Sequence, residues 1–311
     1  MWIYEIKDDS WIKVGETPRL GWHADHSTDN EIQIDPNGYF PFTRACFSMG
    51  DWGIISALPQ LLQSKYPNLT ISIPSKEWLE ARAGSGTWGY QGMNAVDNVD
   101  LIFANNPYID HRFNLGDYTT IITDHHRCYK YETEPLVEQL LRAWGFTEEE
   151  IWQLDTRPQL YFSDEEKQIG DEIIGKYIGS QYYGCTLFAA RIEKYNTRWT
   201  YDIERGLENW MFNVNQFPVF SYSTMPIDDW KAKFPEWIDF KDIPLASIRV
   251  QMYIKQQGLF NIGYQSGLGD ACTGKSIHYI ATPYEKLTET IIRGDDIWYH
   301  HGNGARVCYA R

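Results

Sequence analysis

One stretch near the end of the chain, residues 258–283, limits the possible fold more than any other: GLFNIGYQSGLGDACTGKSIHYIATP. Its two ends predict buried strands, residues 259–264 and 277–281, and between them a small-residue turn precedes a short predicted helix, residues 268–273. Strand, turn and helix in this order bring the free backbone N–H groups of a helix N-terminus to the carboxyl end of a strand, where phosphorylated ligands are commonly held. The stretch therefore predicts an α/β fold with a pocket for a phosphorylated ligand at this turn.

Strand-like runs and amphipathic helical patterns alternate through both halves of the 311-residue chain. Such alternation is typical of parallel sheets covered by helices. It predicts two Rossmann-like domains, residues 1–156 and 157–311, whose strand ends face a common cleft, with residues 1–40 forming an N-terminal β-hairpin extension. The predicted strands are 44–48, 69–73, 99–104, 118–123, 158–161, 185–189, 219–223, 237–240, 259–264 and 277–281. The predicted helices are 54–65, 77–83, 132–144, 164–177, 203–213, 244–256, 268–273 and 284–292.

The composition argues against several classes of protein. A net charge of −14 and a pI near 5.0 disfavour a broad electrostatic grip on nucleic acid. The five cysteines are scattered without the spacing of metal ligands, which is typical of reduced thiols in the cytoplasm. No window of about 18 apolar residues occurs, and the first residues do not form a basic and apolar leader pattern. We therefore expect a cytoplasmic protein that is neither secreted nor inserted in a membrane.

The segment Met49-Gly50-Asp51-Trp52-Gly53 predicts a tight turn between a buried strand and an amphipathic helix. Asp51 would then point from the turn into the cleft, where a carboxylate can act as a general base. The same residue can instead cap the N-terminus of the following helix, a common role for an aspartate in this position. The residues alone leave both roles open.

Three basic residues, Arg191, Lys194 and Arg198, follow the predicted strand 185–189. The phosphates of a bound ligand need charge compensation, and a charge-assisted hydrogen bond contributes about 1.5–3 kcal/mol whereas an exposed helix N-terminus contributes about 0.3–1 kcal/mol. Cationic side chains should therefore carry most of the stabilisation, unless these three are ordinary solvated surface charges. No Asp-x-Asp pattern occurs in the chain, which predicts a site without a divalent metal.

Two glycine-rich motifs compete with this interpretation. Residues 269–276 match the Walker A pattern GxxxxGKS, which suggests a P-loop. A P-loop requires a following helix, whereas the run after Ser276 is strand-like, so Lys275 is better explained as a cation near a helix C-terminus. Residues 84–89 match the dinucleotide pattern GxGxxG but lack a preceding strand, and we interpret them as a loop.

Three histidines could suggest a metal site. His125 and His126 follow the predicted strand 118–123, and His111 lies a little upstream. Adjacent residues at a strand end point to opposite faces, which makes a shared metal unfavourable. These histidines either line the predicted cleft or are ordinary polar loop residues.

Several motifs occur in a fixed order along residues 42–283. They are residues 49–53 followed by Ala57-Leu58-Pro59 and Lys65-Tyr66-Pro67, then residues 106–110, then a basic residue just before Trp199, and finally residues 263–271. Their order and spacing resemble the ADP-heptose:lipopolysaccharide heptosyltransferase family of GT-B glycosyltransferases. Three positions depart from that family: Gln265 and Asp270 stand where it has an acidic residue and a histidine, and Thr197-Arg198-Trp199 replaces Lys-x-Trp. In that family, the residues at these positions contact the sugar donor.

The resemblance implies a GT-B enzyme that transfers a sugar, with inversion, from a nucleotide-diphosphate sugar to an acceptor hydroxyl, on a glycan, without a metal or cofactor. Residues 1–156 would form the acceptor side and residues 157–311 the donor side. The predicted roles are Asp51 as catalytic base; Arg191, Lys194, Arg198, Gln265, Ser266, Gly267, Leu268 and Asp270 in donor binding; and Gly50, Trp52, Gly53, His125 and His126 lining the cleft. Three alternatives stay open: transfer to a modified base in DNA, a P-loop phosphotransferase using residues 269–276, and a non-catalytic module that binds a sugar nucleotide or a glycan.

Overall fold

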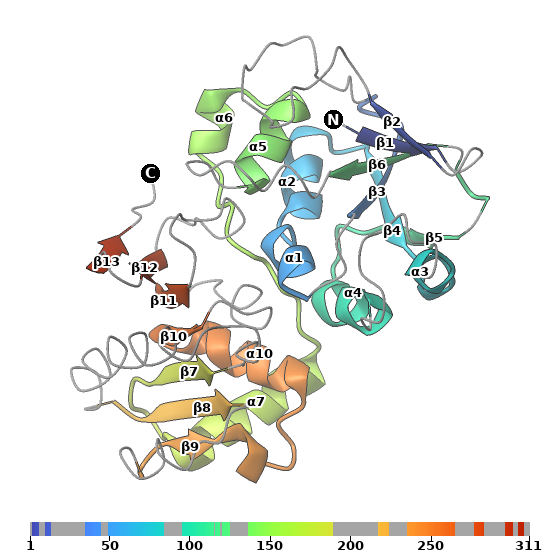
Figure 1. The fold of residues 1–311 in the computed structure, drawn as a ribbon. Helices are drawn as coiled ribbons and strands as arrows, with labels where there is room; N and C mark the ends of the chain where they lie inside the picture. Colours follow the sequence, from blue (N-terminus) through green and yellow to red (C-terminus); the bar gives the residue numbers. More distant parts are fainter. Residues whose placement is uncertain are drawn as a thin grey trace. The chain divides into compact units, whose positions relative to one another are not determined.

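The computed structural model contains two compact units, one running from Met1 to Tyr161 and the other beginning at Phe162. Figure 1 colours the first unit from blue to green and the second from yellow-green to red. Each unit combines a mainly parallel sheet with helices, so the chain is an α/β protein, as predicted. The structure describes residues 2–5, 10–13, 35–44, 49–83, 95–114, 116–118, 120–124, 136–188, 217–223, 235–264, 277–282, 296–300 and 304–307.

The first unit contains a six-stranded sheet with the order β2-β1-β6-β3-β4-β5. Strands β3, β4, β5 and β6 are parallel, whereas β1 pairs antiparallel with both β6 and β2 at one edge. The strands are β1 Trp2–Glu5, β2 Ser10–Lys13, β3 Tyr39–Arg44, β4 Thr70–Pro74, β5 His111–Phe113 and β6 Thr120–Asp124. The helices are α1 Met49–Ile54, α2 Leu58–Lys65, α3 Lys76–Ala83, α4 Ala95–Phe103, α5 Leu136–Ala143 and α6 Glu148–Trp152.

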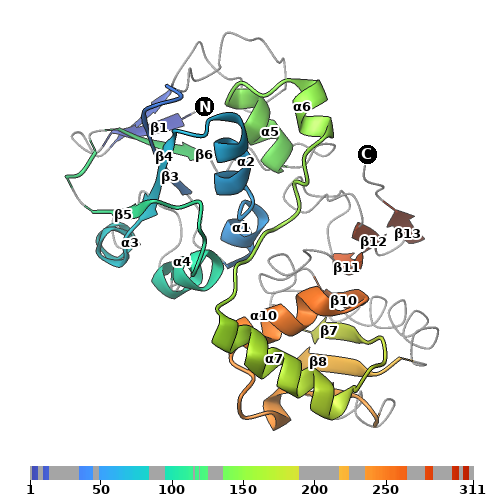
Figure 2. The same ribbon diagram turned by 180° about the vertical axis from the view of Figure 1, so that it is seen from behind.

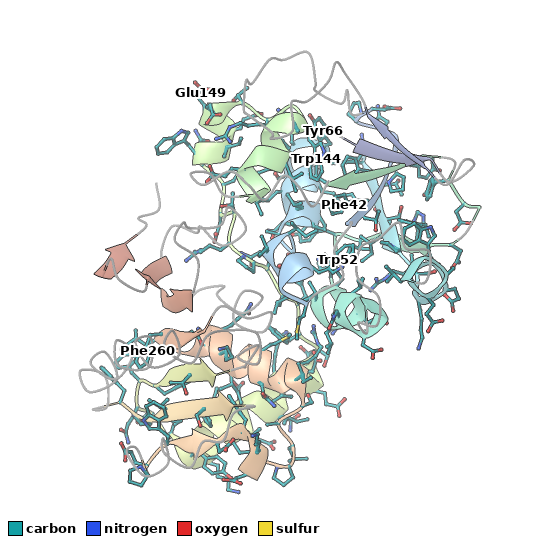
Figure 3. The ribbon with its side chains drawn as sticks, viewed as in Figure 1. Phe42, Trp52, Tyr66, Trp144, Glu149 and Phe260 are labelled. Atoms are coloured by element: carbon teal, nitrogen blue, oxygen red, sulfur yellow. The ribbon has the colours of Figure 1, made fainter. Side chains whose placement is uncertain are left out.

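Aromatic side chains that pack edge to face form the centre of the first core. The ring centroid of Phe42 on β3 lies 6.4 Å from that of Trp52 on α1 and 5.4 Å from that of Trp144 after α5. Trp52 also packs against Phe103 on α4 at 5.7 Å, and both tryptophans have no exposed surface (Figure 3). Each edge-to-face pair contributes about 0.5–1.5 kcal/mol beyond the burial of its area. These rings therefore fix α1, α4 and the end of α5 against the same strand.

The second unit contains a seven-stranded sheet with the order β13-β12-β11-β10-β7-β8-β9. All neighbouring strands are parallel except β13, which pairs antiparallel with β12 at one edge. The strands are β7 Gly184–Phe188, β8 Val219–Ser223, β9 Ile238–Asp239, β10 Phe260–Tyr264, β11 Ile277–Thr282, β12 Asp296–His300 and β13 Gly304–Val307. The helices are α7 Asp164–Tyr177 and α10 Ile248–Gln257, with a short 3-10 helix, Phe240–Asp242, after β9.

Helices α7 and α10 lie side by side on one face of this sheet (Figure 2). Helix α7 starts at Asp164 because Ser163 forms a capping box with Glu166, in which each side chain bonds the other residue's backbone N–H. Arg249 at the start of α10 donates to Glu166 with N–O distances of 2.6 and 3.1 Å, and its guanidinium lies 4.8 Å from the Phe162 ring centroid. Burial by itself raises the pKa of Glu166, but the bonds from Arg249 and Ser163 outweigh it and lower the pKa from its ordinary 4.5.

Most elements of the second unit agree with the predictions from sequence. Helix α7 and strand β8 have the predicted bounds, and β7, β10 and β11 differ from theirs by one residue. Helix α10 begins at Ile248 rather than at residue 244, because Ser247 caps its N-terminus by accepting from the N–H of Val250. The prediction for residues 237–240 was only partly right, since a two-residue strand is followed by a 3-10 turn. The predicted helices 203–213, 268–273 and 284–292 and the loop 84–89 lie outside the described residues.

Four predictions for the first unit were wrong. Residues 99–103, predicted as most of a strand over 99–104, belong to helix α4, whose buried Val99, Ile102 and Phe103 follow a helical period. A short apolar run cannot distinguish a strand from a buried helix. Residues 49–53 are helical rather than a turn, and the predicted helix 54–65 divides into α1 and α2. Residues 158–161 form neither a helix nor a strand.

The fourth error concerns β3, which begins at Tyr39 rather than at residue 44. Pro41 obscured this strand, because proline lacks the N–H that a central strand normally donates. β3 pairs with β4 through residues 39–41 and with β6 through residues 42–44, so Pro41 lies where the pairing passes from one neighbour to the other. Among the helices in the described ranges, none is long and apolar enough to cross a membrane.

Candidate functional site

The strand order of the second unit defines one candidate position for a ligand. In chain order, the six parallel strands β9-β8-β7-β10-β11-β12 read 3-2-1-4-5-6, so the connections from β7 and β10 leave in opposite directions along the sheet. These two strands are direct neighbours, with Leu187 opposite Gly263 near their carboxyl ends. In open α/β sheets, ligands bind outside the carboxyl ends of the strands at such a switch point. The ends of β7 and β10 are therefore the candidate site of this unit.

The predicted donor residues follow these same two strands in the sequence. The chain leaves β7 at Phe188, shortly before Arg191, Lys194 and Arg198, and it leaves β10 at Tyr264, directly before Gln265. The eight predicted donor residues themselves lie outside the described residues: Arg191, Lys194, Arg198, Gln265, Ser266, Gly267, Leu268 and Asp270. Two segments separated by more than sixty residues thus start from adjacent strand ends.

A close contact between β7 and β10 sets their spacing. Gly184 pairs with Phe260, and a Cβ atom at Gly184 would lie 2.0 Å from Cζ of the Phe260 ring. No side chain fits there, so glycine is required for the ring to lie across the start of β7. Phe260 also packs against Phe217 at 6.0 Å between ring centroids, and Figure 3 labels it in the second unit. The aromatic ring thus holds together the two strands whose opposite ends form the switch point.

The face of these strands toward α10 contains buried polar groups with a structural role. Cys185 pairs with Asn261, whose Nδ2 donates to the carbonyl of Lys255 at 3.3 Å. Burial raises the pKa of the Cys185 thiol to about 12, and the neighbouring Lys255 offsets this only in part. Tyr183 donates its hydroxyl to the carbonyl of Ile254 at 2.7 Å, and burial raises its pKa as well. Neither the thiol nor the phenol is available as a nucleophile at neutral pH.

The first unit has a switch point of the same kind. Its parallel strands β5-β4-β3-β6 read 3-2-1-4 in chain order, and Arg44 at the end of β3 lies opposite Asp124 at the end of β6. Helix α1, which carries Gly50, Asp51, Trp52 and Gly53, is the first element after β3. His125 and His126 directly follow β6 but lie outside the described residues. The predicted acceptor residues therefore also follow the two strands of a switch point.

The structure assigns different surroundings to the residues of α1. Asp51 is the third residue of the helix and not its N-cap, because the helix begins at Met49. Its backbone is described and its side chain is not. Gly50 and Gly53 are buried, and Trp52 has no exposed surface and packs against Phe42 and Phe103. Trp52 is thus a core residue, which is the usual place for a large apolar ring on a helix next to a sheet.

Two buried hydroxyls near these strand ends escaped the analysis of the sequence. Thr43 on β3 and Thr186 on β7 are 0% and 1% exposed, and neither Oγ1 atom has a hydrogen-bond partner among the described residues. Thr43 and Thr186 each lie on the parallel strand that comes first in the chain within its sheet, close to the switch point. A buried hydroxyl without a partner is costly, so both positions mark where polar groups are kept despite that cost. A lone threonine inside an apolar strand was the signal in the sequence.

Two competing motifs receive no support from the structure. The residues after Ser276 form strand β11 rather than the helix that a Walker A phosphate loop requires, so the P-loop interpretation is wrong. His111 lies on β5, separated from β6 by β3 and β4, and its Nε2 lies 2.9 Å from the hydroxyl of Tyr118. It is therefore not a neighbour of the β6 end that precedes His125. Within the ranges that the structure describes, no cluster of side chains is suited to hold a metal ion.

Two of the family-like motifs have structural contacts. Lys65 donates to the carbonyl of Gly145 and to Glu150, each at 2.6 Å, and the Tyr66 hydroxyl donates to the carbonyl of Trp144 at 3.1 Å. These bonds tie the end of α2 to the α5–α6 turn, where Figure 3 labels Tyr66 and Trp144. In residues 106–110, a carboxylate oxygen of Asp110 accepts from the N–H of Ile71 on β4 at 2.6 Å. Both motifs therefore stabilise the first unit.

The comparisons with known proteins found similarity in structure. No family model matches the sequence, and no curated protein matches it. The structure is similar to the glycosyl transferase family 9 protein from Veillonella parvula DSM 2008, with a TM-score of 0.57 and 10% identity over 88% of both chains. It also matches E. coli ADP-heptose lps heptosyltransferase II, with a TM-score of 0.45, 14% identity, and 85% and 91% of the two chains covered. For E. coli heptosyltransferase WaaC with ADP-2-deoxy-2-fluoro heptose the TM-score is 0.40, at 10% identity over 84% and 92% of the chains.

Topology and comparison agree on the fold. Each unit is a Rossmann-like sheet with its own switch point. The match to the family 9 protein spans most of both chains, so this chain has the fold of a family 9 glycosyl transferase. The α/β fold that the sequence patterns predict is thereby confirmed.

Proposed function

We propose that this protein is an inverting, metal-independent glycosyltransferase, which transfers a sugar from a nucleotide-diphosphate sugar to an acceptor hydroxyl on a glycan. One observation carries the proposal: in each unit, the residues that the sequence analysis selected follow the two strands of the switch point. The fold of a family 9 glycosyl transferase supports the same class of reaction. The GT-B cleft between residues 1–156 and 157–311 is part of the proposal and rests on the family resemblance.

The donor binds, in this proposal, at the ends of β7 and β10. Arg191, Lys194 and Arg198 compensate the charge of the diphosphate, since charge-assisted hydrogen bonds are the strongest available contribution there. The segment from Gln265 to Asp270 supplies backbone N–H groups and side chains around the phosphates and the sugar. Gln265 and Asp270 differ from the heptosyltransferase pattern, so we propose that they adapt the site to a different sugar nucleotide.

The acceptor binds, in this proposal, at the ends of β3 and β6. Asp51 removes the proton from the acceptor hydroxyl, and the oxygen attacks the anomeric carbon from the side opposite to the diphosphate. The new C–O bond forms as the bond from the anomeric carbon to the diphosphate oxygen breaks, which inverts the configuration. The nucleoside diphosphate leaves with the electron pair, and its charge stays bound to the basic residues.

The experiment compares Asp51→Asn with a matched control, Asp97→Asn, in which an exposed carboxylate of α4 in the same unit is changed. A panel of nucleotide sugars is first screened by thermal shift, since a ligand at 100 times its Kd stabilises the native state by about 2.7 kcal/mol. Asp51→Asn should then reduce transfer by about 100-fold or more while the thermal shift persists, and Asp97→Asn should behave as wild type.

Three outcomes would contradict parts of the proposal. Undiminished transfer by Asp51→Asn would exclude Asp51 as the base. Binding of nucleotide sugars without any transfer would favour the non-catalytic module. Loss of turnover in EDTA that Mg²⁺ or Mn²⁺ restores would exclude a metal-independent reaction. Transfer to DNA carrying a modified base has no supporting observation, and the net charge of −14 opposes it.

A further inference from the structure

The segment that leads from the first unit to the second is fixed by hydrogen bonds to the α1–α2 region. The backbone N–H of Gln159 donates to Oγ of Ser56 at 2.9 Å, and the hydroxyl of Tyr161 donates to Oε1 of Gln60 at 2.9 Å. Burial raises the pKa of the Tyr161 hydroxyl, and nearby Tyr108 adds to the effect, so the hydroxyl keeps the proton that it donates. The connecting segment, which we define as residues 158–161, therefore has two anchors immediately before the second unit begins at Phe162.

Ser56 also contacts the helix that carries Asp51. Its Oγ donates to the carbonyl of Gly53 at 2.7 Å, and its backbone N–H donates to the same oxygen at 3.1 Å. A serine hydroxyl has one proton to donate and lone pairs to accept, so Oγ can bond Gly53 and Gln159 at the same time. Ser56 is 1% exposed, which keeps water from replacing either bond. One buried oxygen atom thus links α1 to the connecting segment.

The chain distance between these groups is short. Gly53 lies two residues after Asp51 in the same helix, α1, which is only six residues long. Ser56 lies in the turn between α1 and α2, so its bond to Gly53 closes the end of α1. Hydrogen bonds in a low-dielectric environment hold their partners more strongly than in water. A shift of the connecting segment at Gln159 would therefore act directly on the end of the helix that carries the proposed base.

We infer that Ser56 is a positioning residue for Asp51, which couples the connecting segment to helix α1 through its bonds to Gln159 and Gly53. The inference rests on the proposed function, because it assigns Asp51 to the transfer step. Ser56 touches neither substrate in this account. It acts through α1, so removing its hydroxyl should affect the rate of transfer and leave the affinity for the nucleotide sugar unchanged, since the proposed donor residues follow β7 and β10 of the other unit.

The test compares Ser56→Ala with Ser64→Ala in the full chain. Ser64 is the matched control because its hydroxyl makes the same kind of bond, to the carbonyl three residues earlier, with an Oγ–O distance of 2.6 Å to Leu61 inside α2. In Ser56→Ala we expect kcat to fall about tenfold while the Kd of the nucleotide sugar changes less than about twofold, a split that a merely structural role would not produce. Ser64→Ala should leave both quantities at the wild-type values. An unchanged kcat in Ser56→Ala would overturn the inference.

Native-state hydrogen exchange of the free protein supplies a readout that needs no substrate. In Ser56→Ala, the amides of Gln159 and of residues 52–56 should exchange about tenfold faster and together, as the loss of a shared hydrogen bond requires. Faster exchange at Gln159 alone would overturn the coupling. If wild type transfers no sugar from any nucleotide sugar, the proposed function fails, and the exchange data still decide whether the coupling exists.

A second variant protects the test against a failure of Ser56→Ala to fold. Tyr161→Phe removes only the hydroxyl that anchors the connecting segment to Gln60. We expect faster exchange at Gln159 and, through Ser56, at the end of α1. If the amide of Gln159 exchanges faster in Tyr161→Phe while the amides of α1 exchange at the wild-type rate, this result alone would overturn the inference.

Discussion

Two glycines of helix α7 offer a direct test of how the second unit packs. Gly170 is buried against α10, and a Cβ atom there would lie 2.3 Å from Cδ1 of Tyr253. Gly175 lies on the exposed side of the same helix, and a Cβ atom there would meet nothing within 4 Å. Substitution by alanine at each site changes the same atoms in the same helix. The two variants differ in whether the new methyl group meets a ring.

The expected magnitudes follow from that difference. Alanine favours a helix interior over glycine by about 0.8–1.0 kcal/mol, which makes Gly175→Ala stabilising by about 0.5–1 kcal/mol near the helix end. Gly170→Ala has the same gain, but its methyl group must displace Tyr253. That ring cannot move freely, because its hydroxyl donates to Asp171 at 2.8 Å and its edge packs against Phe162 at 5.4 Å between centroids. Overpacking of this kind costs about 1–3 kcal/mol, so the free energies of unfolding of the two variants should differ by that amount.

The assay is urea unfolding followed by circular dichroism, supported by native-state hydrogen exchange of α7 and α10 amides, because two units need not unfold in one step. The exchange data assign the loss to the second unit. Replacing Tyr253 by alanine in the Gly170→Ala background should remove most of the penalty, giving effects that are not additive. Equal stability of Gly170→Ala and Gly175→Ala would refute the described packing of α10 on α7.

The remaining predictions concern the ion pair, the thiol and the strand contact of the second unit. Glu166→Gln should destabilise the protein by about 1–3 kcal/mol at pH 7. Folding lowers the pKa of Glu166, so its bond to Arg249 stabilises the protein fully above about pH 4.5 and is lost as the pH falls through the lower pKa of the folded state. The free energies of unfolding of wild type and Glu166→Gln should therefore converge in acid. A difference between them that does not depend on pH would contradict this. Cys185, with a pKa of about 12, should resist iodoacetamide at pH 8 until urea unfolds the protein, and peptide mass spectrometry should locate any modification. Gly184→Ala should lower the Tm and weaken nucleotide-sugar binding, because the methyl group displaces Phe260 from the β7–β10 contact; unchanged calorimetric values would show that this contact is not needed.

Elements with complete local signals could be predicted from the sequence. Helix α7 has its capping box, formed by Ser163 and Glu166, within its own first turn, and its predicted bounds were correct. Strand β8 was also correct, and β10 and β11 differed by one residue. The errors fell where the local signal was ambiguous. The apolar run of α4 is short enough to be read as a strand, and Pro41 hid the start of β3.

The same distinction applies to the candidate site: some of its features could be found from the sequence, and others only from the structure. Sequence alone selected Asp51, the three basic residues after β7 and the segment from Gln265, and it disfavoured the P-loop because the run after Ser276 is strand-like. The structure excluded the P-loop, since strand β11 follows Ser276. The sequence could not show that Thr43 and Thr186 are buried without partners in the described part of the chain, or that Ser56 bonds to Gln159, because these facts depend on residues that are distant in the chain.

The amino-acid sequence by itself determined which segments become helices or strands wherever caps, periodicity and turn residues lie within a few positions of each other. Only the tertiary structure decided which strands became neighbours, and therefore where the two switch points lie. The physical reason is that parallel strands are paired by hydrogen bonds between segments far apart in the chain, such as Leu187 and Gly263, whose register no local pattern encodes.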